Sequence, residues 1–203
     1  MIRSLAIAIL VCLPGLALAQ SYPALHDVTG VAADDVLNVR EAPSAQSAII
    51  ANLAPDTPGV EVVRADASGR WGLVNTGERS GWASLRYLTP QPPGDYALTR
   101  ILICAGTEPF WDITIRQGSS ALLHRLSSPD ITFSAGLLQG ASGRSDRFSL
   151  QGEADGATLT TLVRRTACSD GMSDREFGLD ADLLIRGQGD LLHLSGCCTL
   201  IGD

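Results

Sequence analysis

The residues with the greatest chemical potential are the cysteines in the second half of the chain. Cys104, Cys168, Cys197 and Cys198 lie there, and the remaining one of the five cysteines is Cys12. An even number of cysteines in an exported domain is typical of disulfides. Adjacent residues of a strand point to opposite faces, so Cys197 and Cys198 can reach different partners, one of them Cys104 and the other Cys168. We therefore predict two structural disulfides.

Other uses of these thiols fit the sequence less well. The segment from His193 to Cys197 lacks a familiar zinc spacing, so we predict no metal and no cofactor. A cysteine nucleophile would need a base, and the three histidines are His26, His124 and His193. The last two lie in alternating apolar segments, where we expect them to face solvent. A serine enzyme is not indicated either, because the Gly-x-Ser-x-Gly turn is absent from the sequence.

Charged residues near Trp111 form the remaining candidate site. Pro109 favours an extended backbone at Glu108, and a disulfide from Cys168 would bring the Asp174-Arg175 pair toward it. One interpretation is a structural ion pair between carboxylate and guanidinium. Another is a pocket for a small polar ligand lined by Glu108, Trp111, Asp174 and Arg175. A third is a hydrolase of envelope polymers that uses Glu108 and Asp174 as acid and base.

The Asp170-Gly171 dipeptide next to this pair predicts a tight turn. Glycine accepts a positive φ there. The segment Asp170 to Asp174 lacks the acidic spacing and terminal glutamate of a calcium loop.

Short alternating apolar segments separated by Gly, Ser and Pro indicate that these residues are positioned by β-strands. Residues 24–89 read as a small barrel of strands, residues 90–95 as a proline-rich linker, and residues 96–203 as an antiparallel β-barrel or sandwich with two disulfides. The fold class is therefore all-β.

The first of these segments contains Leu37-Asn-Val-Arg40, then Ala42-Pro-Ser44, and closes with Gly81-Trp-Ala-Ser84. Together these motifs resemble the bacterial SH3-like domain family, although Arg70 precedes Trp71 where glycine is common, and Ala83 replaces the usual valine. The resemblance implies a module that binds cell-wall peptide or a partner protein. Trp71 and Trp82 either pack in the small core or line a groove for a peptide or glycan.

The second segment contains three dense blocks. Cys104-Ala-Gly-Thr-Glu-Pro-Phe-Trp111, Cys168-Ser-Asp-Gly-Met-Ser-Asp174 and Gly196-Cys-Cys198 resemble a family of uncharacterised bacterial envelope proteins. Phe177-Gly178 stands where that family often has an aromatic-proline pair. The resemblance implies an envelope location and no particular activity.

Residues 1–19 predict a cleaved signal peptide, with Arg3 before an apolar run and Ala17-Leu-Ala19 at its end. A lipid on Cys12 is the alternative, but Val11 is larger than a lipid-attachment site requires. Cleavage changes the net charge from -7 to -8, because only Arg3 is lost. A chain this acidic is a poor candidate for nucleic acid, and no second apolar run is long enough for a membrane span.

We therefore expect a periplasmic or secreted, non-catalytic envelope protein. Its SH3-like module would bind cell-wall peptide or glycan, or an envelope protein. Its second domain would be a recognition or inhibitory head.

Overall fold

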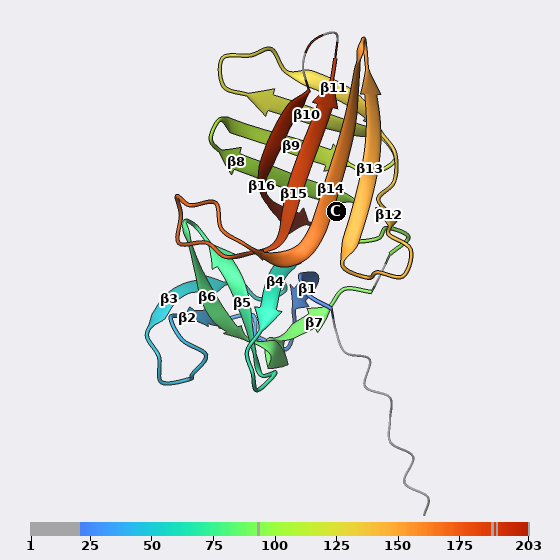
Figure 1. Ribbon diagram of the computed structural model, residues 1–203. Helices are drawn as coiled ribbons and strands as arrows, with labels where there is room; N and C mark the ends of the chain where they lie inside the picture. Colours follow the sequence, from blue (N-terminus) through green and yellow to red (C-terminus); the bar gives the residue numbers. More distant parts are fainter. Residues whose placement is uncertain (1–20, 93, 188, 190, 203) are drawn as a thin grey trace, which may run out of the picture.

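The computed structural model describes residues 21–92, 94–187, 189 and 191–202, and over these residues the chain consists mainly of β-strands. The strands form two antiparallel sheets, which lie one above the other in Figure 1. We call the first the N-terminal module and the second the C-terminal barrel. The all-β prediction is confirmed, whereas the signal peptide predicted over residues 1–19 lies outside the described residues. No helix in the described part of the chain is long and apolar enough to cross a membrane.

The N-terminal module is a seven-stranded sheet in the order β3-β2-β6-β5-β4-β1-β7. Its last strand ends at Pro90, inside the segment predicted as a linker. The next residue, Gln91, still donates its N–H to the Leu25 carbonyl (2.9 Å) and its Nε2 to Asp27 (2.8 Å). The elements are β1 (Ala24–Val28), β2 (Leu37–Arg40), β3 (Ile49–Leu53), β4 (Val60–Ala65), β5 (Trp71–Thr76), β6 (Arg79–Ser84), the 3-10 turn η1 (Leu85–Tyr87) and β7 (Leu88–Pro90).

Alternation along the strands builds the core of the module. Leu37 and Val39 of β2 are buried, as the alternation predicts, while Asn38 and Arg40 point to the other side. The buried cluster consists of Val28, Leu37, Val39, Val62, Val74, Ala83 and Leu88.

The C-terminal barrel has the strand order β11-β10-β9-β8-β16-β15-β14-β13-β12. Pairing of β11 with β13 closes this sheet, so the open choice between barrel and sandwich resolves as a barrel. Figure 1 shows β13 to β16 running upright and β8 to β10 crossing behind them. The strands are β8 (Ile101–Thr107), β9 (Phe110–Arg116), β10 (Ser120–Arg125), β11 (Ile131–Ala135), β12 (Gln139–Gly140), β13 (Arg147–Ala154), β14 (Ala157–Cys168), β15 (Phe177–Arg186) and β16 (Leu192–Ile201).

The same period of two fills the barrel interior. In β15 every second residue from Phe177 to Ile185 is buried. Their neighbours Asp180 and Asp182 are only partly buried and lie on the outer face. Pairing with β14 on one side and β16 on the other holds this segment extended.

Two disulfides connect the barrel strands, as predicted. Cys104 of β8 pairs with Cys198 of β16, and Cys168 at the end of β14 pairs with Cys197. The adjacent cysteines do reach different partners, and their connectivity is now defined. The second bridge fixes the start of residues 169–176, which we call the connecting loop.

The connecting loop joins the barrel to the N-terminal module through hydrogen bonds of the loop's backbone groups. Asp174 donates its N–H to the Glu78 carbonyl (2.9 Å) and accepts from the Ser80 N–H (3.1 Å). Glu176 donates its N–H to the Ser80 hydroxyl (2.8 Å), and its carbonyl accepts from the Asn75 side-chain amide (2.9 Å). The loop therefore extends the edge of the β5–β6 hairpin.

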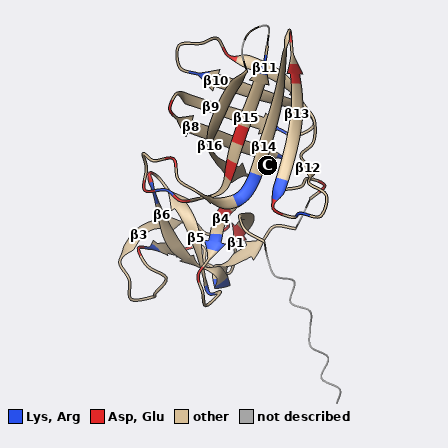
Figure 2. Cartoon of the chain, in the orientation of Figure 1, with Lys and Arg blue, Asp and Glu red and all other residues tan. Residues whose placement is uncertain are grey.

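Side chains on both sides strengthen this junction. Arg64 forms an ion pair with Glu176 at 3.0 Å. Leu25 of β1 packs with the barrel's core cluster rather than with the module's. Gly178 lies so close to the module that a Cβ there would be 2.8 Å from Pro23 Cδ and 3.1 Å from the Val63 carbonyl. Figure 2 shows charged segments of β14, β15 and β4 near this junction.

The two disulfides should differ in how much they contribute to the stability of the fold. They close segments with sequence separations of 94 and 29 residues. Loop entropy gives about 4–5 kcal/mol for the Cys104–Cys198 bridge and about 3–4 kcal/mol for the Cys168–Cys197 bridge. We expect the free energy of unfolding, measured by guanidinium denaturation, to fall by these amounts in Cys104→Ser/Cys198→Ser and in Cys168→Ser/Cys197→Ser.

Trypsin distinguishes the local role of each bridge, because Arg175 lies in the connecting loop. Under native conditions Cys168→Ser/Cys197→Ser should be cleaved after Arg175 faster than Cys104→Ser/Cys198→Ser. Equal cleavage rates would show that the Cys168–Cys197 bridge does not fix the loop.

Candidate functional site

A groove on the N-terminal module carries aromatic and charged side chains. Its volume is about 560 Å³. Trp71 at the start of β5 and Tyr87 at the end of η1 supply the aromatic surface, and Asp35, Arg40 and Arg86 supply the charges. The described residues that line it are Gly30, Val31, Ala32, Asp35, Val36, Leu37, Asn38, Arg40, Ala45, Trp71, Ser84, Arg86 and Tyr87.

The charged side chains of the groove differ in how they are held. Arg40 donates from Nη1 to the Ser47 carbonyl at 2.6 Å, which orients its guanidinium. Arg86 is exposed, and its guanidinium carbon lies 5.6 Å from the centroid of the Tyr87 ring. The Asp35 carboxylate accepts the N–H of the next residue. Two guanidinium groups against one carboxylate give the groove a positive balance in a chain of net charge -7.

Trp82 lies away from this groove. The guanidinium carbon of Arg64 stands 4.8 Å from the Trp82 ring centroid, and the same Arg64 pairs with Glu176 of the connecting loop. Trp82 therefore supports the junction, whereas Trp71 lines the groove.

A second cavity, which we call the rear pocket, lies on the barrel where the β8–β9 turn meets the connecting loop. Its volume is about 890 Å³. Glu108, one of the predicted site residues, lines it. The other lining residues are Thr107, Pro109, Phe110, Leu126, Ser127, Asp170, Gly171 and Met172.

Trp111, which was expected to line a ligand pocket, lies in the barrel core instead. Its side chain is 4% exposed and belongs to the barrel core. Gly106 and Gly196 make room for its ring: a Cβ at Gly106 would lie 2.3 Å from Trp111 Nε1, and one at Gly196 would lie 2.9 Å from Trp111 Cζ2. Both glycines belong to the sequence blocks that contain cysteines, so part of that pattern serves the packing of one indole.

Asp174 and Arg175 also lie elsewhere than at the rear pocket. Asp174 pairs through its backbone with the β5–β6 hairpin. Arg175 places its guanidinium carbon 4.8 Å from the Phe177 ring centroid. Its charge helps to lower the pKa of Asp170 and acts in the same direction on Glu61. Asp170, rather than Asp174, is the second carboxylate beside Glu108.

Asp170 is an acceptor for its own loop. Burial opposes its ionisation, but the Ser173 and Met172 N–H groups and the Ser173 hydroxyl outweigh this effect and lower the pKa of Asp170. Gly171 has a φ of 71°, which confirms the predicted tight turn.

Glu61 is an informative residue that the sequence did not single out. It lies in β4, and its Oε1 accepts the Leu200 N–H of the barrel at 3.0 Å. Its Oε2 is buried and has no hydrogen-bond partner among the described residues. Burial raises the pKa of Glu61 to about 7, and the Leu200 N–H and the charge of Arg175 oppose this only in part. The alternation Val60-Glu-Val62 reads as an ordinary exposed acid, so no sequence signal marks it.

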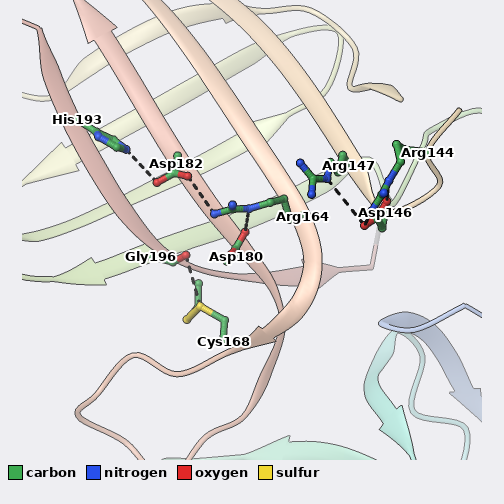
Figure 3. A network of polar contacts seen from close by, with 10 residues as sticks. Arg144, Asp146, Arg147, Arg164, Cys168, Asp180, Asp182, His193 and Gly196 are labelled. Atoms are coloured by element: carbon green, nitrogen blue, oxygen red, sulfur yellow. Dashed lines mark hydrogen bonds and ion pairs between the residues drawn. A yellow bond between two sulfur atoms is a disulfide. The ribbon is translucent and has the colours of Figure 1, made fainter. Parts of the chain in front are cut away.

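The outer face of β14 to β16 carries a polar network (Figure 3). Arg164 pairs with Asp180 at 2.8 Å and with Asp182 at 3.2 Å. Asp182 also contacts His193 Nε2 at 2.9 Å. The side chain of His193 is 57% exposed, as expected for a solvent-facing strand position. Exposed pairs of this kind contribute little individually, so we assign the network a surface role.

Metal and thiol chemistry have little support in the described residues. Cys104, Cys168, Cys197 and Cys198 are all in disulfides. Within the described ranges no group of three or more His, Cys, Asp and Glu side chains is arranged to hold a metal ion.

Comparison with known proteins gives no relative from which to transfer a function. No protein-family model matches the sequence, and neither the curated proteins nor the solved structures include a match.

The packing around Trp111 leads to a stability prediction. Gly106→Ala places a methyl group against the indole and the Ser195 carbonyl, so it should cost about 1–3 kcal/mol in free energy of unfolding. Gly140→Ala is the matched control, because no atom of the described residues lies within 4 Å of a Cβ there. Similar stability of the two variants in urea denaturation would refute the proposed crowding.

Glu61 leads to a prediction about pH. Its pKa is about 7 in the fold against an ordinary 4.5, so folding favours the protonated form. This contribution is complete below about pH 4.5 and is lost as the pH rises through about 7. We expect the free energy of unfolding of the wild type to fall across this window by roughly 3 kcal/mol relative to Glu61→Gln.

Comparing the wild type with Glu61→Gln cancels the contributions that the other titrating groups make to the pH dependence of stability. His26 is one of them; burial lowers the pKa of His26, so its contribution runs in the opposite direction. Parallel pH profiles of the wild type and Glu61→Gln would contradict this role for Glu61.

Proposed function

We propose that this protein is an exported, non-catalytic binding protein of the bacterial envelope, whose groove binds a short peptide that carries carboxylates. Cell-wall stem peptide has this chemistry. The observation that carries the proposal is the groove itself, in which Trp71 and Tyr87 stand beside Arg40 and Arg86.

The groove suits such a ligand in two ways. Aromatic side chains offer a flat apolar surface for a peptide backbone and its aliphatic side chains. Arginine binds carboxylates through paired hydrogen bonds, and Arg86 is free to adjust because it is exposed. The resemblance of residues 24–89 to the SH3-like family supports the same class of ligand.

The disulfides support export. Two bridges indicate an oxidising, extracellular environment, where thiols pair rather than remain reduced. A signal peptide over residues 1–19 and a periplasmic or secreted location are consistent with this environment.

The position of the carboxylates favours binding over hydrolysis. The alternative enzyme would use Glu108 and Asp174 as acid and base. Glu108 lines the rear pocket, whereas Asp174 is not among its lining residues and pairs with the β5–β6 hairpin. General acid–base catalysis needs both groups on one substrate. The barrel therefore serves better as a recognition or inhibitory head than as a catalyst.

Co-sedimentation with purified peptidoglycan tests the groove. The chain from residue 20 onward should bind, and Arg86→Ala should weaken binding at least about ten-fold because a charge-assisted contact is lost. Trp71→Ala should also weaken binding. Arg116→Ala is the control, since Arg116 is an exposed arginine of β9 outside the groove.

Two results would reject this proposal. One is equal binding by Arg86→Ala and Arg116→Ala. The other is clearing of peptidoglycan by the wild type in a zymogram, which would favour the hydrolase.

A further inference from the structure

Exposed apolar side chains from three separate segments meet at the rear pocket. Phe110 is 51% exposed, Leu126 68% and Met172 67%. Leu126 and Met172 are the two most exposed large apolar side chains among the described residues. Single exposed apolar residues are ordinary, but several around one cavity indicate an interaction surface.

Local hydrogen bonds hold these three side chains in position. The Leu126 N–H donates to the Phe110 carbonyl at 3.2 Å, which joins the first two. The Met172 N–H donates to the Asp170 carboxylate at 3.0 Å, and the Asp170 carbonyl accepts from the Thr107 hydroxyl at 3.1 Å. The Cys168–Cys197 bridge anchors the same loop. A surface ordered before binding loses less entropy when a partner docks.

The charge of the rear pocket is negative. Its lining contains the carboxylates of Glu108 and Asp170 and, within the described residues, no lysine or arginine. Asp170 is engaged by its own loop, whereas Glu108 is exposed and has no hydrogen bond or ion pair with any described residue. Glu108 is therefore available to a cation on a partner.

We propose that the rear pocket is a docking surface for a protein segment in which a large apolar side chain stands beside lysine or arginine. Phe110, Leu126 and Met172 would enclose the apolar side chain, and Glu108 would pair with the cation. Methionine adapts to apolar partners of different shapes, and both methionine and aromatic residues are enriched at protein interfaces. The inference deepens the proposed function, on which it rests only in treating the barrel as the recognition head.

A second copy of the chain fits this surface less well. A two-fold contact would place the same patch on both sides and so bring Glu108 of one copy toward Glu108 of the other. Like charges that meet in an interface are unfavourable. Charge complementarity therefore favours a basic partner.

Random linear peptides displayed on phage, selected against the full mature chain, provide the test. We expect enriched peptides to carry an aromatic or large aliphatic residue adjacent to lysine or arginine. A synthetic copy of the most enriched peptide should bind at least about ten-fold more weakly to Phe110→Ser and to Met172→Ser, measured by fluorescence anisotropy. Glu108→Gln should weaken binding less and reduce its dependence on salt.

Matched controls separate this surface from general stickiness and from the groove. Ile49→Ser removes an apolar side chain of similar exposure (52%) on the N-terminal module, and Glu41→Gln removes an exposed carboxylate there. Neither should change the affinity, nor should Arg86→Ala. If the wild type binds the selected peptide but not peptidoglycan, only the proposal for the groove is rejected. If it binds peptidoglycan but no selected peptide, only the proposal for the rear pocket is rejected.

Three outcomes would overturn the inference. The first is an acidic or purely polar consensus among the selected peptides. The second is unchanged affinity in Phe110→Ser and Met172→Ser, with folding confirmed by circular dichroism. The third is concentration-dependent dimerisation of the wild type that Met172→Ser abolishes, which would assign the surface to a second copy.

Discussion

The connecting loop is the constraint on which the rest of the structure depends. Cys168 immediately precedes the loop and is tied to β16 by a disulfide. The other end of the loop continues into β15. Between these points Asp174 and Glu176 extend the hairpin of the N-terminal module, while Met172 faces the rear pocket. One short segment thus sets both the position of the module and one wall of the barrel's cavity. Its acidic residues Asp174 and Glu176 make backbone and ion-pair contacts with the module.

The junction between module and barrel combines favourable apolar packing with the unfavourable burial of a carboxyl group. Leu25 enters the barrel's core cluster, and Gly178 allows the module to approach closely. The Glu61 carboxyl is buried in the same region, and one of its oxygens has no hydrogen-bond partner in the described part of the chain. A buried carboxyl with incomplete hydrogen bonding favours its neutral form. We therefore expect the contact of Glu61 with the barrel to weaken as the pH rises through about 7, whereas the backbone hydrogen bonds of the junction do not titrate.

Alternation and cysteine spacing made much of the fold predictable. Leu37 and Val39 are buried because β-strands have a period of two, and adjacent Cys197 and Cys198 reach different partners for the same reason. Barrel closure through β11 and β13 was not predictable, because long-range pairing leaves no local signal. The proposed SH3-like resemblance remains a prediction, since the strand order alone does not test it.

The candidate site was predictable only in part. Trp71 lines the groove and Glu108 the rear pocket. Trp111 is core because two glycines that are distant in sequence leave space for its ring. Proximity in sequence to Glu108 suggested a shared pocket, but Glu108 lies in the turn between β8 and β9, whereas the Trp111 side chain of β9 is buried in the barrel core. The exposed cluster of Phe110, Leu126 and Met172 was hidden because its members come from three separate segments.

The groove and the rear pocket differ in charge. The groove has two arginines and one aspartate, and the rear pocket has two carboxylates and no described cation. Under the proposed function, a rigid junction would hold these two surfaces at a fixed separation, so that one molecule would bind wall material and a basic protein segment together. This arrangement gives a reason for the extensive contacts of the connecting loop.

Hydrogen–deuterium exchange at the junction tests this account most directly. The amides of Ser80, Asp174 and Glu176 donate across the junction, and the amide of Leu200 donates to Glu61. If module and barrel form one unit, these amides should exchange as slowly as those in the middle of β15. Exchange as fast as that of exposed turn residues such as Gly143 would show that the two parts separate freely and would contradict the account.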